Sequence, residues 1–423
     1  MLRSMVFRGV VAAMCTLAAA WSAVADEKTP KKPATPADKP EVKWAPAVNP
    51  KPLSEHVKQG TKWLVEHQLK KGAWGQGEES AHMGGGSQMK DVPSVADTCM
   101  ATLALIRAGN TPAKGECANN VLHAVAFICG EIEESDMDSL FVTPTRGTRV
   151  QSKLGPYIDT FLAAVLLPEV KDQMPDDAGK KRVAAALDKL LAKIQKNQRA
   201  DGTWGGQGWA TTIQQGLAVK GLNRAAQYGV QVDEKIRARA EQQARQSFDR
   251  GSGKFKEEGS AGVQLYSAGS NLGSVAESVK TNNQRKSQLE MKLASPSATA
   301  PEKAEAHATL DRYKSAEKDL QDAQTAVIAR LDDKQFIAGF GSNGGEEFLS
   351  YMNIGESLVV KGGDTWKAWD KSIGENLDRV QNGDGSWSGH HCITGRTFCT
   401  SAALLVLMVD RSPLPISEKM KKR

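Results

Sequence analysis

The sequence predicts an all-α fold in which about six helical hairpins close into a ring, an α/α toroid. A turn motif that starts with Gln and ends with Gly-x-Trp recurs along the chain, as Gln68–Trp74, Gln198–Trp204 and Gln381–Trp387. Each copy follows a segment with helical periodicity and precedes a segment of small and apolar residues. A motif that recurs in this way is typical of a repeat protein built from similar units.

The chain begins with the features of a secretory signal. Arg3 and Arg8 give the chain a positive start, and an uncharged apolar stretch follows from Val11 to Val24. Ala23-Val24-Ala25 then has small residues where such a signal is cleaved. We therefore expect residues 1–25 to be removed and the mature protein to be secreted or periplasmic. The apolar stretch is short for a membrane anchor, and we expect no transmembrane segment after cleavage.

The next residues and the end of the chain are polar. Residues 26–52 contain seven prolines and almost nothing apolar beyond Trp44, which is typical of an extended, disordered linker. Residues 411–423 form a basic tail that we expect to be solvated. Cleavage removes two of the 55 basic residues, so 53 face 49 acidic ones, and this near balance gives no reason to expect nucleic acid as a partner.

Residues 53–410 are expected to form the ring. In the first hairpin, residues 53–67 carry one apolar face, while residues 94–108 are apolar on nearly all sides. The first helix should therefore lie outside and the second inside. The same order is expected in five more hairpins, at residues 119–170, 181–228, 232–279, 339–360 and 366–408. Six hairpins contain twelve helices, which is the number that closes an α/α barrel.

One polar segment, residues 280–327, interrupts this period. Its middle is Ser295–Pro301, and Leu310, Tyr313, Leu320 and Val327 follow at a heptad-like spacing. We expect an inserted helical hairpin with coiled-coil-like packing that projects from the ring. It is either an arm that docks a partner or a solvated decoration.

The first turn motif belongs to a longer pattern, Lys58-x-Gly60-x-x-Trp63-Leu64-x-x-x-Gln68-x-x-x-Gly72-x-Trp74. This pattern resembles the QW repeat of squalene cyclases, and the copies at Gln198 and Gln381 are similar to it. Over residues 53–410, without the inserted arm, the chain thus resembles the prenyltransferase and squalene-oxidase repeat superfamily. The resemblance implies an α/α toroid with an apolar lumen.

Activity differs within that superfamily, which contains terpene cyclases, protein prenyltransferases and non-enzymatic relatives. The D-x-D-D motif with which squalene-type cyclases protonate an alkene is absent from the sequence. A protonating cyclase is therefore disfavoured, and whether the protein is an enzyme stays open.

Acidic residues stand where the expected inner helices begin. They are Asp97, Asp159 and Glu347, the last preceded by Glu346. Because the inner helices of a toroid begin at the same end, these carboxyls should converge at one mouth of the central cavity, and we take Asp97, Asp159 and Glu347 as candidate catalytic residues. Acidic residues in a first turn also stabilise a helix by roughly 0.3–1 kcal/mol each, so capping alone is the alternative.

A dense group of candidate ligands lies in the loop before the last inner helix, from His390 to Cys399. Ring closure would bring this loop beside Asp97-Thr98-Cys99. The resemblance to protein prenyltransferases, which bind zinc through a D-x-C pair and a histidine, implies a zinc site at Asp97, Cys99, His390, His391 and Cys399. The chain departs from that pattern, because Cys399 stands at the position of the zinc-binding histidine and the two elements occur in the opposite order.

A disulfide is the competing interpretation, since exported proteins meet oxidising conditions. The mature chain has five cysteines, an odd number that leaves at least one unpaired. Cys392–Cys399, Cys117–Cys129 and Cys99–Cys399 are the possible pairs, and buried free thiols are the third alternative.

Aromatic residues suggest the ligand. Trp209, Tyr157 and Phe398, together with Arg396, are candidate ligand-binding residues, whereas the three motif tryptophans should be structural. An apolar, aromatic cavity suits an apolar, isoprenoid-like small molecule, which the polar mouth would bind or transform. Two alternatives remain: a non-catalytic scaffold for a protein partner, and a carbohydrate-active barrel whose paired carboxyls would stand roughly 5–10 Å apart.

Overall fold

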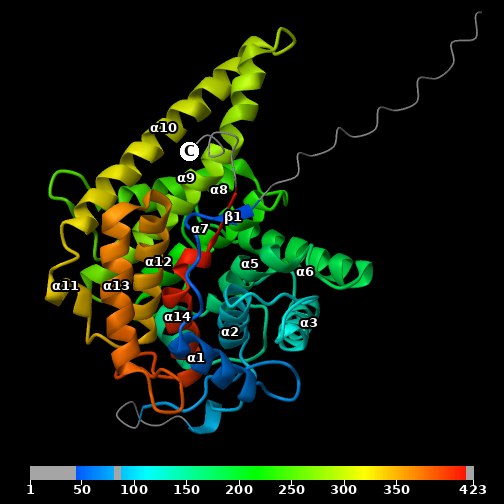
Figure 1. Ribbon diagram of the computed structural model, residues 1–423. Coiled ribbons are helices and arrows are strands. Elements are labelled where there is room, and N and C mark those ends of the chain that lie inside the picture. Colours follow the sequence, from blue (N-terminus) through cyan, green and yellow to red (C-terminus); the bar gives the residue numbers. More distant parts are fainter. Residues whose placement is uncertain (1–43, 81–86, 416–423) are drawn as a thin grey trace, which may run out of the picture. The chain divides into compact units, whose positions relative to one another are not determined.

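The structure is a computed structural model that describes residues 44–80 and 87–415, and it confirms an all-α fold (Figure 1). Fourteen α-helices account for most of the described chain, with two short two-stranded sheets. None of the described helices is long and apolar enough to cross a membrane. The expected signal peptide, most of the expected linker and residues 416–423 of the expected tail lie outside the described residues.

The helices alternate between half-buried and fully buried ones. The helices with one buried face are α1 (Glu55–Glu66), α3 (Ala118–Glu134), α6 (Asp177–Lys196), α8 (Glu234–Gln246) and α13 (Gly363–Val380). The helices buried on nearly all sides are α2 (Val95–Arg107), α5 (Ile158–Val170), α7 (Thr211–Gln227), α12 (Gly345–Lys361), α14 (Arg396–Leu407) and the first half of α9 (Gln264–Ala294). Short helices α4 (Arg149–Leu154) and α11 (Lys334–Ala338) lie in the connections.

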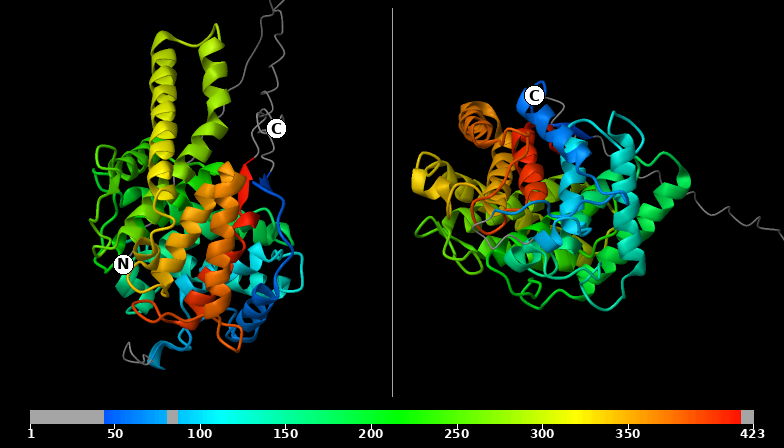
Figure 2. Two further views of the ribbon diagram at one scale, coloured as in Figure 1. Left: turned by 60° about the vertical axis from the view of Figure 1, so that its left-hand side comes forward. Right: turned by 90° about the horizontal axis from the view of Figure 1, so that it is seen from below.

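The six buried helices contact one another in a closed order. Helix α2 packs against α5, α5 against α7, α7 against α9, α9 against α12, α12 against α14, and α14 against α2 again. Figure 2 shows the red α14 beside the blue and cyan first hairpin, although the two are far apart in the sequence. The half-buried helices pack outside this order, with α3 on α2 and α6, and α8 on α7 and α9.

The three motif tryptophans close their turns onto the preceding outer helix. Each indole is buried, and its N–H donates to the carbonyl oxygen ten residues earlier over 2.8 Å, Trp74 to Leu64, Trp204 to Ile194 and Trp387 to Leu377. Burying an indole without a partner for its N–H would be costly. The repeated spacing between Trp and helix therefore has a direct structural cause.

The motif glutamines connect each turn to the next outer helix. Gln381 Nε2 donates to Gly385 O in its own turn at 2.8 Å and to His56 O at the start of α1 at 2.9 Å. The other two copies repeat this arrangement, Gln68 with Gly72 and Asn120 of α3, and Gln198 with Gly202 and Ile236 of α8. The last copy thus joins the end of the chain to the first hairpin.

The polar segment 280–327 forms the far half of α9 and most of α10 (Ala300–Ile328), and this helical hairpin extends away from the other helices (Figures 1 and 2). No Gly or Pro falls between Ser274 and Ala294, so nothing ends α9 where it leaves the core. Thr299 and Glu302 form a capping box that starts α10. The base of the hairpin packs through Val275, Val279 and Ala316 onto Ala244 of α8.

The described end of the expected linker differs from an extended, disordered chain. Strand β1 (Trp44–Pro46) pairs antiparallel with β4 (Pro413–Pro415), so part of the expected solvated tail is also ordered. Trp44 stacks on Tyr228 with 4.0 Å between ring centroids, and Lys51 N donates to Asp410 Oδ2 at 2.7 Å. Stacking of Trp44 on this aromatic partner offsets the entropic cost of ordering the segment. The composition of residues 26–52 does not reveal the partner.

The last motif turn offers a matched test of its geometry. Gly385 has φ +88°, and a Cβ there would lie 2.9 Å from Gln59 O, so we expect Gly385→Ala to lower the free energy of unfolding by about 1–3 kcal/mol. Gly383→Ala, in the same turn but with no heavy atom within 4 Å of its Cβ, should change it by less than about 0.5 kcal/mol. Urea titration measures the free energy of unfolding of both variants. Equal losses would contradict the requirement for glycine at position 385.

Candidate functional site

Hydrogen bonds bring the beginnings of four inner helices together. Asp159 Oδ1, at the start of α5, accepts from Ala96 N of α2 at 2.9 Å. Thr397 N of α14 donates to Gln76 O in the segment before α2 at 3.2 Å. Glu346 Oε2 of α12 accepts from Ile393 N in the loop before α14 at 3.2 Å. The acidic residues singled out in the sequence therefore lie at one end of the inner helices.

Asp97 and Asp159 are buried among these helix ends. Asp159 Oδ2 accepts from Gln151 Nε2 at 2.8 Å, so this carboxylate ties α2, α4 and α5 together. Asp97 is fully buried, and burial raises its pKa to about 7, an effect that the Ser94 hydroxyl only partly opposes. Both carboxyls are covered by protein, and the two carboxyl oxygens of Asp97 have no hydrogen-bond partner among the described residues. Burial of this kind fits a structural role better than attack on a dissolved substrate.

Glu347, the third candidate, is one member of a buried cluster with Tyr266 and His391. Its Oε1 accepts from Tyr266 OH at 2.5 Å and from Phe340 N at 3.0 Å, and its Oε2 lies 3.5 Å from His391 Nε2. Burial lowers the pKa of His391, with the charge of Glu347 opposing the shift, so the imidazole is neutral near pH 7. Tyr266 was not singled out from the sequence because its contact with Glu347 joins α9 to α12 across 81 positions.

A glycine-rich loop, residues 339–344, covers this cluster. A Cβ on Gly341 would lie 2.6 Å from His391 Cδ2, and one on Gly344 would lie 2.7 Å from Glu347 Oε2. Side chains at either position would displace the imidazole or the carboxylate. The glycines are therefore required where the loop backbone approaches the buried pair.

Glu346 adds a second buried carboxyl beside Glu347. Burial, and then the charge of Glu347, raise the pKa of Glu346 to about 8, so it is largely protonated at neutral pH. Five buried polar atoms here have no hydrogen-bond partner among the described residues: Glu346 Oε1, Glu347 Oε2, Asn343 Oδ1 and both ring nitrogens of His391. Acid–base groups are present, but they are covered by protein.

The residues expected to bind zinc do not converge. His390 Nε2 lies 3.3 Å from Asn343 Nδ2, His391 faces Glu347, and Cys399 Sγ donates to Ile393 O at 3.3 Å. Within residues 44–80 and 87–415, no group of three or more His, Cys, Asp or Glu residues has a geometry that could hold a metal ion. Asp97, Cys99, His390, His391 and Cys399 therefore do not fit a zinc ion in this arrangement.

The disulfide expectation is corrected by the structure. All five cysteines of the described chain are free thiols, so the pairs Cys392–Cys399, Cys117–Cys129 and Cys99–Cys399 are not formed. Cys99 and Cys399 are fully buried, and burial raises the pKa of each thiol well above its usual value. They behave as small core residues, which was the third alternative.

The candidate ligand-binding residues lie in different places. Phe398 is fully buried in the core, and Tyr157 packs on Phe141 with 4.9 Å between ring centroids. Arg396 forms an ion pair with Asp384 and lies 3.9 Å from Glu78. Trp209 is 39 % exposed and Phe340 is 54 % exposed. Their rings contact each other edge-to-face, with 5.8 Å between the ring centroids.

The space between the inner helices is almost filled. A cavity of about 20 Å³ is lined by Met, Leu, Val and charged side chains of α2, α5, α7, α12 and α14. At one side of it, Lys220 of α7 donates to Glu356 of α12 at 2.5 Å, which joins two helices across the centre.

A buried ionic network at the other end of the inner helices was missed in the sequence. Arg107 of α2 forms a bidentate pair with Glu169 of α5 at 2.6 and 2.8 Å. Arg224 of α7 bridges Glu169 and Glu277 of α9 at 3.1 Å each. A charged residue inside an otherwise apolar helix, such as Glu169 in α5, was the available signal.

Comparison with models of known protein families gave no match to this chain, and a search of curated protein sequences gave no significant match either.

The buried Glu346 predicts a pH-dependent stability. Its pKa is about 8 when folded against a usual value of 4.5, so between these values only the unfolded state loses the proton and the free energy of unfolding falls as pH rises. Glu346→Gln removes this contribution. As pH rises through this range, the free energy of unfolding of the variant should increase relative to that of wild type by up to about 1.4 kcal/mol per pH unit.

Urea titrations between pH 4 and pH 9 measure this difference. Glu290→Gln, at an exposed position of the projecting hairpin, is the matched control and should stay parallel to wild type. A curve for Glu346→Gln that is also parallel to wild type would show that Glu346 is ionised in the folded protein.

Proposed function

We propose that the protein is a closed α/α toroid with a filled centre and that it serves as an interaction scaffold for a protein partner. The closed order of contacts from α2 through α14 and back supports the toroid. So does the position of Gln381, whose amide reaches His56 at the start of the first hairpin. The QW-like motifs are consistent with the same arrangement.

The filled centre is the observation that carries the scaffold proposal. A space of about 20 Å³ admits about one water molecule. Sites for small organic ligands usually measure about 300–1,000 Å³. An isoprenoid-like ligand, the first expectation from the sequence, would require the inner helices to separate and the pair Lys220–Glu356 to break.

The carboxyls at the mouth also favour a scaffold. A carbohydrate-active barrel needs two carboxyls that face an open cleft, whereas Asp97, Asp159 and Glu347 are 0 %, 3 % and 0 % exposed. The oxygens of Asp159 and Glu347 contact the start of α2, Tyr266 and His391, whereas those of Asp97 have no hydrogen-bond partner among the described residues. These groups support the framework on which the exposed loops rest.

An exposed aromatic patch, Trp209 and Phe340, is the proposed docking point. The two rings come from different loops and contact each other edge-to-face. Lys153 Nζ lies 5.4 Å from the centre of the Trp209 ring and adds a cation. Aromatic residues held rigidly on a surface are typical of the few residues that dominate the binding energy of protein interfaces.

Enlarging the central cavity should allow the protein to bind a small apolar ligand there. Leu217→Ala and Leu405→Ala remove side chains that line the central space, and each should lower the free energy of unfolding by about 2–5 kcal/mol. The enlarged apolar cavity should then bind benzene, which thermal denaturation detects as a raised Tm. Wild type should show no shift with benzene or farnesol. A clear rise in the Tm of wild type with farnesol would instead support an apolar ligand site in the centre.

The docking point is tested by photocrosslinking in the cells that make the protein. A benzophenone amino acid in place of Phe340 should give a discrete adduct with a second protein, and Trp209→Ala should remove that adduct. The same amino acid in place of Met291, which is 66 % exposed on the projecting hairpin, is the control and should give none. Equal adducts at both positions, or none at Phe340, would contradict the proposed interface.

A further inference from the structure

A second feature, outside the ring centre and the aromatic patch, is a polar cleft between the third and fourth hairpins. Its volume is about 440 Å³. We call it the α7–α9 cleft, because its floor consists of residues from these two helices. The end of α8, the turn 199–204 and the loop around Lys256 form its walls.

The cleft exists because the side chains of α7 and α9 are short where the helices meet. A Cβ on Gly216 would lie 3.3 Å from Ser270 O, which shows how closely the two backbones approach. On the α9 side, the floor residues Ser267, Ser270, Asn271 and Ser274 lie at helical spacing. In the fourth hairpin, Gly253-Lys254-Phe255 stands in place of the Gly-x-Trp motif, and Phe255 lies in the short strand β3 (Lys254–Phe255).

The hydroxyl groups of the cleft act mainly as acceptors toward a ligand. Ser274 OH donates to Ser270 O at 2.7 Å, Ser267 OH to Gln264 O at 3.1 Å, and Ser247 OH to Gln243 O at 3.2 Å. Each proton is therefore used within its own helix or helix end, while the oxygen keeps lone pairs free.

Two further floor atoms have no partner among the described residues. They are Ser270 Oγ and Asn271 Oδ1, and their side chains are only 3 % and 5 % exposed. Nearly all buried polar atoms in proteins have hydrogen-bond partners. Asn271 Oδ1 can only accept, whereas the Ser270 hydroxyl can donate or accept. The two atoms therefore point to a ligand whose polar groups donate and also accept hydrogen bonds.

The charges around the cleft restrict the class of ligand. At its rim, Arg199 and Lys256 are balanced by Asp201 and Glu258, and the floor side chains from α7 and α9 are neutral. An ammonium or guanidinium group would lose its hydration without a carboxylate on the floor to compensate. An apolar ligand would leave the acceptors buried without partners. A neutral ligand with several hydroxyl groups satisfies both conditions.

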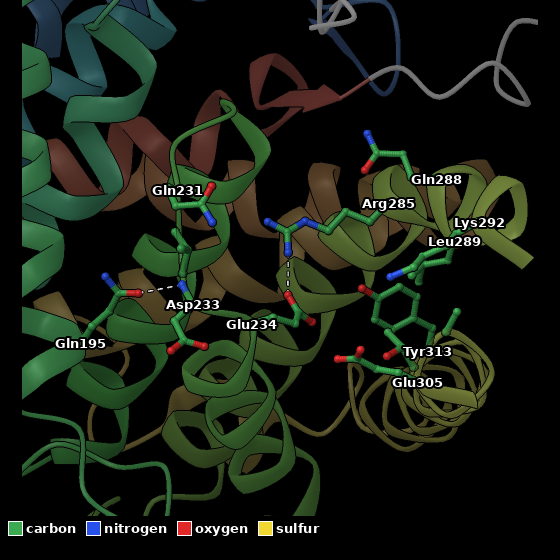
Figure 3. Close-up of a pocket in the computed structure, with 13 residues that line it drawn as sticks. Gln195, Gln231, Asp233, Glu234, Arg285, Gln288, Leu289, Lys292, Glu305 and Tyr313 are labelled. Atoms are coloured by element: carbon green, nitrogen blue, oxygen red, sulfur yellow. Dashed lines mark hydrogen bonds and ion pairs between the residues drawn. The ribbon is translucent and has the colours of Figure 1, made fainter. Parts of the chain in front are cut away.

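The larger cleft under the projecting hairpin differs in this respect. It measures about 920 Å³, and Figure 3 shows two interactions among its lining residues, an ion pair between Arg285 and Glu234 and a hydrogen bond from the backbone N–H of Asp233 to Gln195. Its walls carry the charged residues Lys292 and Glu305. It therefore lacks the neutral, acceptor-rich floor of the α7–α9 cleft and is a suitable place for a control substitution.

We propose that the α7–α9 cleft binds a neutral saccharide of one or two sugar units, with Ser270 and Asn271 accepting hydrogen bonds from its hydroxyl groups. The cleft volume of 440 Å³ lies within the range of about 300–1,000 Å³ for small-molecule sites. The site is separate from the proposed docking point, so the two are tested independently.

The test titrates the full chain with glucose, galactose, N-acetylglucosamine, maltose and cellobiose and follows binding by isothermal calorimetry and saturation-transfer NMR. At least one sugar should bind. Asn271→Leu, which removes the unpartnered acceptor, should weaken binding at least about tenfold. Gln243→Trp, which places an indole at the wall from α8, should abolish binding without changing the floor.

Gln288→Leu, in the larger cleft, is the control and should bind the same sugar with unchanged affinity. If Asn271→Leu fails to fold, Gln243→Trp alone decides the result, because it lies at the half-exposed wall. The proposal is overturned if none of the five sugars binds. It is also overturned if the wall variant binds as wild type does, or if spermidine or an uncharged tetrapeptide binds at this cleft when the sugars do not.

Discussion

The closed order of the inner helices depends on the contact between the last and the first hairpins, to which the side-chain amide of Gln381 contributes. Its nitrogen donates to Gly385 O in its own turn and to His56 O in the first hairpin, and its oxygen is hydrogen-bonded to the His56 imidazole. Each such bond contributes only about 1 kcal/mol, but a carbonyl left unpaired at this half-buried contact would cost more. The same side chain therefore closes a local turn and connects residues that are 325 positions apart.

The two ends of the inner helices are stabilised by different chemistry. At their beginnings lie Asp97 and Glu346, whose pKa values burial raises, and helix dipoles favour any negative charge that remains there. At their other ends, Arg107, Glu169 and Arg224 form ion pairs that join α2, α5 and α7. Removing one partner of such a buried network leaves an uncompensated charge, so the network favours one arrangement of helices over others.

The sequence predicted the local parts of this fold well and the non-local parts poorly. The spacing from Gln381 to Trp387 predicted a turn because two of its hydrogen bonds are local, from Gln381 to Gly385 and from Trp387 to Leu377. The bond from Gln381 to His56 is not local and was not predicted. The distinction between outer and inner helices followed from one-sided and all-round apolarity. By contrast, Trp44 looked like part of a disordered linker because its partner Tyr228 is remote in the sequence.

The candidate site shows the same limit. The zinc and disulfide expectations placed Asp97-x-Cys99 beside the loop from His390 to Cys399, and α14 does pack against α2. Proximity of segments does not determine where side chains point: His391 faces Glu347, and Cys399 faces a backbone carbonyl. Native-state hydrogen exchange tests the closed ring most directly. If the ring is closed, the amides of α2 and α14, on either side of the closure, should exchange as slowly as those of α7. Much faster exchange confined to α2 and α14 would show that the ring is open between them.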